Sequence, residues 1–374
     1  MRIIFLLVAL LFVLGIFAYI VRASFRVKKI LCPRIPDKVI RVAAGLMGVL
    51  IVFSNLFAAS LPAFVRKANA YGFALLLISF VILLILEILL FPVRLSKYKL
   101  LLYQKFVAGT ALFAIIFTLF FGVFQAENIE IKEYHLSIKE NTSLQSLRVV
   151  HLSDLHLGTI QDAAWLGNLV DKTNHLKPDM VLITGDLFDG DMQVLENPDT
   201  VGELLSSFET KYGTFLCWGN HDAGETFPQM REMVEGAGIV ILEDGAQIVG
   251  DKLFAIGGRR DSGPIGEQGR EREAVEARWS EQLENIPFIV MDHRPSNIEE
   301  YGDYVDLILS GHTHQGQVFP GSLVTDMIFP VDYGFYEKEN GTQVIVSSGV
   351  GTWGPPIRLG TRSEIVLIEI SFDS

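Results

Sequence analysis

The chain has 374 residues and a net charge of −12; half of its residues are apolar, and it contains two cysteines. This apolar content allows a buried core and excludes intrinsic disorder, while two cysteines cannot build a disulfide scaffold. The charge is divided unevenly: residues 1–126 hold 14 Lys or Arg and two acids (net +12), whereas residues 127–374 hold 17 and 41 (net −24). The strongly acidic C-terminal part argues against nucleic acid as a partner, because a phosphate backbone repels a negatively charged surface.

Four stretches with at most one charge precede residue 127, at 3–21, 42–65, 68–93 and 106–126. Each is about as long as the ~20 residues that cross a hydrocarbon core, so we expect four transmembrane helices. Stretch 3–21 is alternatively a signal peptide, although it is long for one and a basic segment follows it. Glu87 lies inside the third stretch, and we expect it to reach water or a neighbouring helix rather than to serve transport.

The loops between these stretches differ in charge. The loops after the first and third stretches hold eleven Lys or Arg, against three on the other side (Arg2, Arg66 and Lys67). The positive-inside rule places the basic loops in the cytoplasm. We therefore expect a multi-pass inner-membrane protein whose C-terminal part faces the exoplasmic, or periplasmic, side.

After residue 146 short apolar runs alternate with amphipathic stretches, which is typical of an α/β domain with buried sheets. We expect residues 127–146 to be a linker, with an edge strand as an alternative. The expected strands are 147–152, 180–184, 214–218, 239–242, 253–256, 288–291, 305–309, 343–347 and 365–370. The expected helices are 163–175, 200–208, 227–235 and 270–283.

Short polar motifs follow the ends of five of these strands, where α/β sheets bind ligands. In chain order they contain Asp154 and His156; Gly185, Asp186 and Asp189; Gly219, Asn220, His221 and Asp222; Asp292 and His293; and Gly311, His312, His314, Gly316 and Gln317. Histidine, carboxylate and amide side chains suit Mn, Fe, Zn or Co. Such an inventory favours a centre of two metal ions that clamps a phosphate and activates water.

Each motif alone also has an ordinary structural interpretation. Aspartates after a strand cap helices, and Gly-Asn-His-Asp is a good turn sequence. Gly-His-x-His, at Gly311 to His314, is the most specific of the five. The complete ordered set, each member after a strand, favours the metal centre.

This ordered set of motifs resembles the calcineurin-like metallophosphoesterase superfamily. The resemblance covers nearly all of residues 147–374, which we therefore expect to form the phosphoesterase domain. Together with Gly-His-Thr-His-x-Gly-Gln, the segment from Ser347 through Gly-Val-Gly-Thr-Trp-Gly-Pro-Pro-Ile to Arg358 resembles the membrane-associated bacterial subgroup typified by YaeI and YkuE. The resemblance implies two mixed β-sheets packed as a sandwich and flanked by helices, behind a transmembrane anchor at 1–126.

The resemblance also implies roles for individual residues. Asp154, His156 and His314 would bind one divalent metal ion, Asn220, His293 and His312 a second, and Asp186 would bridge both. A metal-bridging hydroxide would be the nucleophile, with His221 as general acid or phosphoryl stabiliser.

Other residues near the motifs have expected supporting roles. Asp222 would orient His221, and Asp292 would brace His293. Asp189 would be a supporting or turn residue. Arg358 would meet the substrate phosphate or form a salt bridge, and Trp353 would line a pocket.

The leading interpretation is a membrane-anchored phosphoesterase, dependent on two metal ions, acting on a phosphomonoester, phosphodiester or pyrophosphate. The apolar segment 318–332 directly follows the last motif and favours a phosphorylated lipid as substrate, although it could instead pack over the sheet. Soluble nucleotides or small phosphates are the alternative substrates. A membrane sensor or scaffold that only binds is the alternative of another class.

Overall fold

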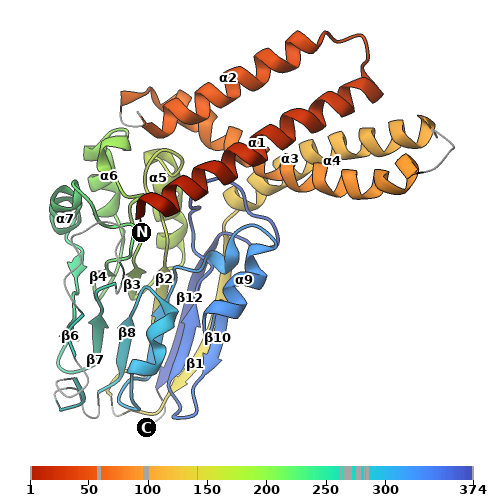
Figure 1. Cartoon of the computed structure of the whole chain (residues 1–374). Coiled ribbons are helices and arrows are strands. Elements are labelled where there is room, and N and C mark those ends of the chain that lie inside the picture. Colours follow the sequence, from red (N-terminus) through yellow and green to blue (C-terminus); the bar gives the residue numbers. More distant parts are fainter. Residues whose placement is uncertain are drawn as a thin grey trace. The chain divides into compact units, whose positions relative to one another are not determined.

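The computed structural model describes residues 2–56, 60–95, 101–140, 142–261, 263, 272–274, 279–281, 283 and 286–372. The chain divides into two compact units, Met1–Phe124 and Gln125–Ser374 (Figure 1). The first unit is helical, and the second contains both β-sheets. Each unit is considered by itself.

Among the described residues the first unit has four α-helices, which overlap the four apolar stretches of the sequence: α1 (Arg2–Leu31), α2 (Asp37–Leu56), α3 (Ala63–Leu95) and α4 (Leu101–Glu127). Within the described residues two segments, Ala63–Phe91 and Leu102–Glu127, are long and apolar enough to cross a membrane. The expected count of four spans is therefore not confirmed. Glu87 of α3 forms an ion pair with Arg26 of α1, so this acid has a partner on a neighbouring helix.

The second unit contains two six-stranded mixed sheets. In spatial order the first sheet consists of β1 (Glu130–Ile138), β12 (Glu364–Phe372), β2 (Ser146–Leu152), β3 (Met180–Thr184), β4 (Thr214–Cys217) and β5 (Val240–Ile241). The second consists of β10 (Gly334–Glu337), β11 (Gln343–Val346), β9 (Leu307–Ser310), β8 (Phe288–Met291), β7 (Phe254–Gly258) and β6 (Gly245–Val249). This arrangement confirms two mixed sheets of the expected fold.

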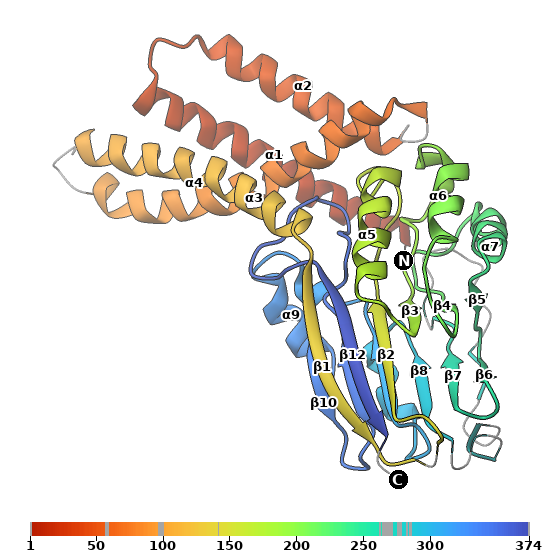
Figure 2. The same ribbon diagram turned by 180° about the vertical axis from the view of Figure 1, so that it is seen from behind.

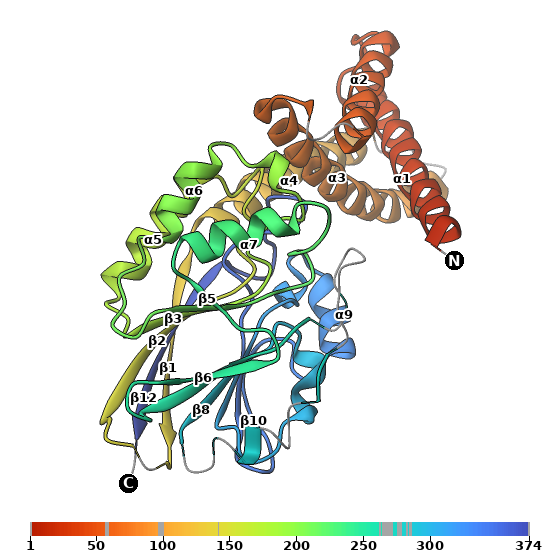
Figure 3. The same cartoon turned by 90° about the vertical axis from the view of Figure 1, so that its left-hand side faces the viewer.

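Apolar side chains bury both faces of the first sheet. On one face pack α5 (Ala163–His175), α6 (Pro198–Leu205) and α7 (Phe227–Gly236), which close a core around Leu166, Val201 and Met230 (Figure 3). The other face meets the second sheet in a core that contains Leu182 of β3 and Ile289 of β8. Because β3 is covered on both sides, all five of its residues are buried, as the continuous apolar run requires.

Three strands and one helix are additions to the expected set. Strand β1, in the segment expected as a linker or edge strand, pairs in parallel with β12 at the edge of the first sheet (Figure 2). Strands β6 and β10 close the two edges of the second sheet, and α9 (Gly321–Ile328) follows the last polar motif. Half of the expected helix at 270–283 lies outside the described residues; of the others, 279–281 are helical and 272–274 are not.

The register of the strands brings the polar motifs to one end of the sandwich. Strands β2, β3 and β4 are parallel to one another in the first sheet, and β8 and β9 are parallel in the second. The loops that follow their carboxyl ends hold the five motifs.

Candidate metal centre

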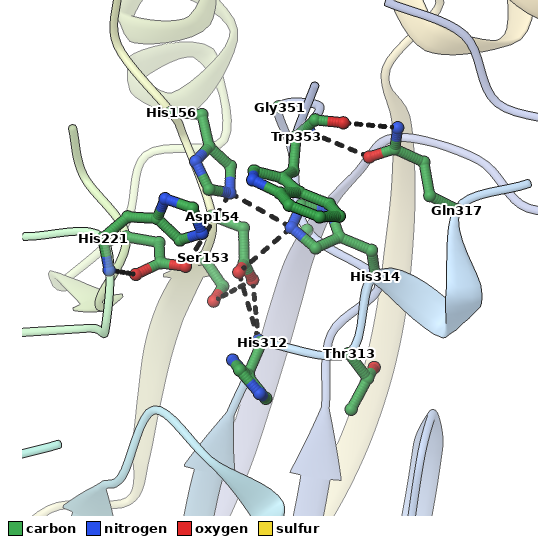
Figure 4. A network of polar contacts seen from close by, with 12 residues as sticks. Ser153, Asp154, His156, His221, His312, Thr313, His314, Gln317, Gly351 and Trp353 are labelled. Carbon is green, nitrogen blue, oxygen red and sulfur yellow. Dashed lines mark hydrogen bonds and ion pairs between the residues drawn. The ribbon is translucent and has the colours of Figure 1, made fainter. Parts of the chain in front are cut away.

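Seven polar side chains that the sequence predicts as metal ligands come from five loops at this end of the sandwich (Figure 4 shows part of the group). Six of them form two groups of three. Within each group the three ligand atoms lie within 4.8 Å of one another. The first group is Asp154, His156 and His314, and the second is Asp186, His293 and His312.

Short contacts join these groups and add the seventh residue. Asp186 Oδ2 lies 3.3 Å from His293 Nε2 and 3.8 Å from His156 Nε2, so this oxygen faces both groups. Asn220 Oδ1 lies 3.1 Å from His293 Nε2. The backbone N–H of His312 donates to both carboxylate oxygens of Asp154, at 3.1 and 3.0 Å. The structure therefore brings all seven predicted residues together, with Asp186 between the groups.

The backbone is strained where it presents these side chains. Asp154, His156, Asp186, His312 and His314 all have a positive φ, between 49° and 72°. Residues with a side chain seldom adopt this left-handed region, and such strain persists where the surrounding structure holds it for a function. Five of the seven side chains are therefore aimed by a conformation that costs free energy.

Glycine is required at one point beneath the centre. A Cβ atom on Gly219 would overlap the backbone nitrogen and Oδ1 of Asp186, neither of which can move away cheaply. Gly219 also donates its backbone N–H to Asp222 Oδ2 at 2.9 Å. The first residue of this motif is thus a glycine because the loop after β4 touches the loop after β3.

Replacing Gly219 with alanine is expected to lower the free energy of unfolding by about 1–3 kcal/mol, the usual cost of overpacking, and to displace Asp186. Gly236→Ala is the matched control, since nothing lies within 4 Å of a Cβ atom at that position in α7. The measurement is the Tm of the purified full chain with and without Mn²⁺. An unchanged Tm for Gly219→Ala would show that the loops are not in contact.

Burial and the two carboxylates set the electrostatics of the site. Burial would lower the pKa of His293, but the Asp186 charge, its hydrogen bond and the charges of Asp154 and Asp261 together outweigh burial and raise that pKa to about 10. Burial would raise the pKa of Asp186, but His293, His156 and His221 together hold it far below its usual range. Burial, together with His293, lowers the pKa of His312 to about 3. The buried carboxylates therefore favour positive charge at this point.

The donor set fits divalent metal ions. His156 Nε2 faces His314 Nε2 at 3.1 Å, and His312 Nδ1 lies 3.3 Å from His293 Nε2. A neutral imidazole has one lone-pair nitrogen, and a metal ion can accept lone pairs from several facing nitrogens. Imidazole, carboxylate and carboxamide donors suit Mn, Fe, Zn or Co.

His221 lies beside the first group, and its carboxylate neighbour differs from the expected one. Its ring packs edge-on against His156, and its Nδ1 lies 3.9 Å from Asp189 Oδ1. Asp222, expected to orient His221, instead accepts backbone N–H groups of Leu187, Phe188 and Gly219. Those three bonds use the Asp222 carboxylate to tie two loops together, so the expected bond to His221 is wrong.

Asp292 also has a different partner from the expected one. Its carboxylate oxygens bind Arg272, at 3.0 and 2.5 Å, and the hydroxyl of Tyr301 donates to one of them at 2.6 Å. His293 is braced instead by the backbone, because its Nδ1 lies 2.8 Å from the carbonyl oxygen of Thr184. Arg272 was not identified from the sequence, because its pairing depends on the tertiary fold.

Arg358 is fully buried, which contradicts the expected contact with substrate phosphate. Its Nη2 donates to the carbonyl oxygens of Ser348, Gly349 and Gly351 at 2.7, 3.0 and 2.8 Å. The same nitrogen lies 3.3 Å from Nδ1 of His314. Arg358 therefore holds the glycine-rich loop behind His314.

Trp353, by contrast, is 54% exposed at the rim of the site. Its ring centroid lies 5.9 Å from that of His221 (Figure 4). Gln317 fixes the Trp353 backbone, accepting its N–H at 2.8 Å and donating to its carbonyl oxygen at 2.9 Å. Trp353 thus lies exposed beside His221, and its lining of a pocket stays a prediction.

The sequence of this chain is similar to those of a known protein family and several of its members. Residues 147–316 match the calcineurin-like phosphoesterase family. An uncharacterised metallophosphoesterase of Aquifex aeolicus is 30% identical over 247 residues, covering 65% of this chain and 92% of that protein. One of Helicobacter pylori is 30% identical over 60% of each chain. A transmembrane protein with metallophosphoesterase domain of Danio rerio is 31% identical over 60% of this chain and 53% of that protein.

The chain therefore belongs to the calcineurin-like metallophosphoesterases, which confirms the resemblance drawn from the motifs. YkuE of Bacillus subtilis is also similar, at 27% identity over 60% of this chain and 78% of that protein. The chain spans 60% of the length of the Helicobacter relative.

Proposed function

We propose that this protein is a phosphoesterase that uses two divalent metal ions to hydrolyse a phosphomonoester, phosphodiester or pyrophosphate. The observation that carries the proposal is the pair of adjacent ligand groups, because Asp186 Oδ2 of the second group also faces His156 of the first. In this assignment Asp154, His156 and His314 would hold one ion. Asn220, His293 and His312 would hold the other, and Asp186 would contribute to both.

Two such ions, when bound, neutralise the charge of a phosphate group and lower the pKa of a water molecule. The side chains of the chain then orient the reaction. His221 is partly exposed and faces the centre beside His156, so it can protonate the leaving oxygen. Asp189 positions this ring, because its Oδ1 lies 3.9 Å from His221 Nδ1 and 3.5 Å from His156 Nδ1. The Trp353 ring covers one side of His221 and limits the access of water.

Removal of metal tests this proposal directly. The full chain, purified in detergent and treated with a chelator, is expected to lose hydrolysis of p-nitrophenyl phosphate or of its bis ester. Added Mn²⁺, Fe²⁺, Zn²⁺ or Co²⁺ should restore it, and the most effective ion indicates the native metal. Hydrolysis that survives complete metal removal would contradict the proposal.

We also propose that the first unit is a multi-pass membrane anchor with the catalytic unit on the periplasmic side. Support comes from the two apolar helices, the uncharged stretches covered by α1 and α2, and the excess of basic residues in two loops. The Danio rerio relative is named as a transmembrane protein. The anchor keeps the site near a membrane surface, so phosphorylated lipids and small phosphates are both candidate substrates.

A further inference from the structure

Helix α9 and Phe319, two residues before it, expose large apolar side chains. Met327 is 85% exposed, and Phe319, Leu323, Val324 and Ile328 are each more than half exposed. No residue of α9 is buried, so the helix does not contribute to the core. A group of exposed apolar side chains on one short helix is typical of a surface that meets a lipid or another protein.

The α9 segment itself contains no basic residue. Residues 319–337 include neither Lys nor Arg, and their charged members are Asp326, Asp332 and Glu337. This segment therefore offers no basic side chain to anionic headgroups. The contact it can make is insertion of apolar side chains among lipid chains.

Helix α9 is fixed to the metal centre. A Cβ atom on Gly316, two residues after His314, would overlap the backbone of Gly321, the first residue of α9. At the other end of the helix, the Phe329 ring lies edge-on to His312, with centroids 5.6 Å apart. The apolar surface is therefore continuous with two of the predicted ligands.

The same edge of the unit receives the chain from α4. The Ser363 hydroxyl donates to the carbonyl oxygen of Ala126, near the end of α4, at 2.8 Å. Four residues before Ser363, the Leu359 carbonyl accepts the backbone N–H of Phe319 at 2.8 Å. Within the second unit, these two hydrogen bonds and the chain from Leu359 to Ser363 thus connect Ala126, where the chain arrives from α4, to Phe319 before α9.

We propose that α9, with Phe319, inserts into the bilayer interface beside the end of α4, and that the metal centre thereby acts on a phosphate carried by a membrane lipid. The substrate part rests on the phosphoesterase function proposed above. The insertion part rests on the exposed apolar side chains of Phe319 and α9 and on the connection of Phe319 to the end of α4. The competing explanation is that another protein binds the exposed apolar side chains of α9. The experiment below distinguishes this contact from insertion into lipid.

The test places a fluorescent label on α9 in the full chain, reconstituted in phosphatidylcholine nanodiscs. Met327→Cys carries the label in a Cys32→Ser background, since Cys32 is exposed and Cys217 is buried. Glu339→Cys is the matched control. It is exposed in the turn before β11, at the end of the sandwich opposite the metal centre.

The label at position 327 should be quenched by nitroxide-bearing lipid and protected from aqueous iodide, and the label at 339 should behave in the opposite way. Replacing half of the lipid with phosphatidylglycerol should leave the quenching unchanged. Quenching of the 327 label by iodide would overturn the proposal, because α9 would then face water. Protection from both quenchers would also overturn it, because protein would then cover the helix.

Substrate choice tests the second part. Met327→Glu should lower the ratio of turnover of a phosphorylated lipid in bilayers to turnover of p-nitrophenyl phosphate by about tenfold, because a charge at this position opposes insertion. An unchanged ratio would overturn the lipid assignment. If the unsubstituted chain hydrolysed neither substrate, the proposed phosphoesterase function would be wrong. The quenching result would still stand.

Discussion

Replacing Asp186 with asparagine is expected to lower metal-dependent turnover by about 10³-fold or more, since two-metal clamps supply several kcal/mol of charge stabilisation. The amide keeps the shape of the carboxylate. Its oxygen can still accept the backbone N–H of His221, which donates to Asp186 Oδ1 at 2.7 Å. The lost feature is the charge on Oδ2, the atom that faces both ligand groups. The measurement is kcat with p-nitrophenyl phosphate at saturating Mn²⁺.

Asp199→Asn is the matched control, because it makes the same change at an exposed position in the first turn of α6. Its turnover should stay close to that of the unsubstituted chain. If Asp186→Asn retained full turnover and full metal content, Asp186 would not bridge two ions.

Replacing His221 with asparagine is expected to reduce turnover by about 10²–10⁴-fold for a strongly basic leaving group, the usual contribution of a general acid. The loss should be far smaller for p-nitrophenyl phosphate, because p-nitrophenolate departs without a proton. The measurement compares phenyl phosphate with p-nitrophenyl phosphate. A dependence on the leaving group separates proton donation from a purely structural role, which would lower both rates equally.

His175→Asn is the control, since His175 is an exposed histidine near the end of α5 whose Nδ1 lies 2.7 Å from the Asp171 carbonyl oxygen. It should leave both rates unchanged. Equal losses for the two substrates in His221→Asn would contradict proton donation by His221.

The strands and the composition of the site could be predicted because both follow local rules. The apolar run 180–184 forms β3, and 288–291 forms β8, with the expected bounds. Each polar motif lies where its strand ends, so strand order was not needed to bring the seven residues together. Short apolar runs and residue types suited to metal ions carry this information.

The partners of buried polar groups could not be predicted in this way. Asp222 is adjacent to His221 in sequence but binds backbone N–H groups of another loop. Asp292 pairs with Arg272, 20 residues earlier, and Arg358 binds carbonyls within its own loop. These choices depend on which loops meet in the folded chain. The edge strands β6 and β10 were also not predicted, since their exposed faces weaken the apolar pattern.

The central claim is that this chain holds two metal ions between the loops of the two sheets. The most direct test is the metal content of the purified full chain, measured by mass spectrometry beside Asp186→Asn and the Asp199→Asn control. The account predicts two ions per chain in the unsubstituted protein and the control, and fewer in Asp186→Asn. One ion or none in a hydrolytically active unsubstituted chain would contradict it.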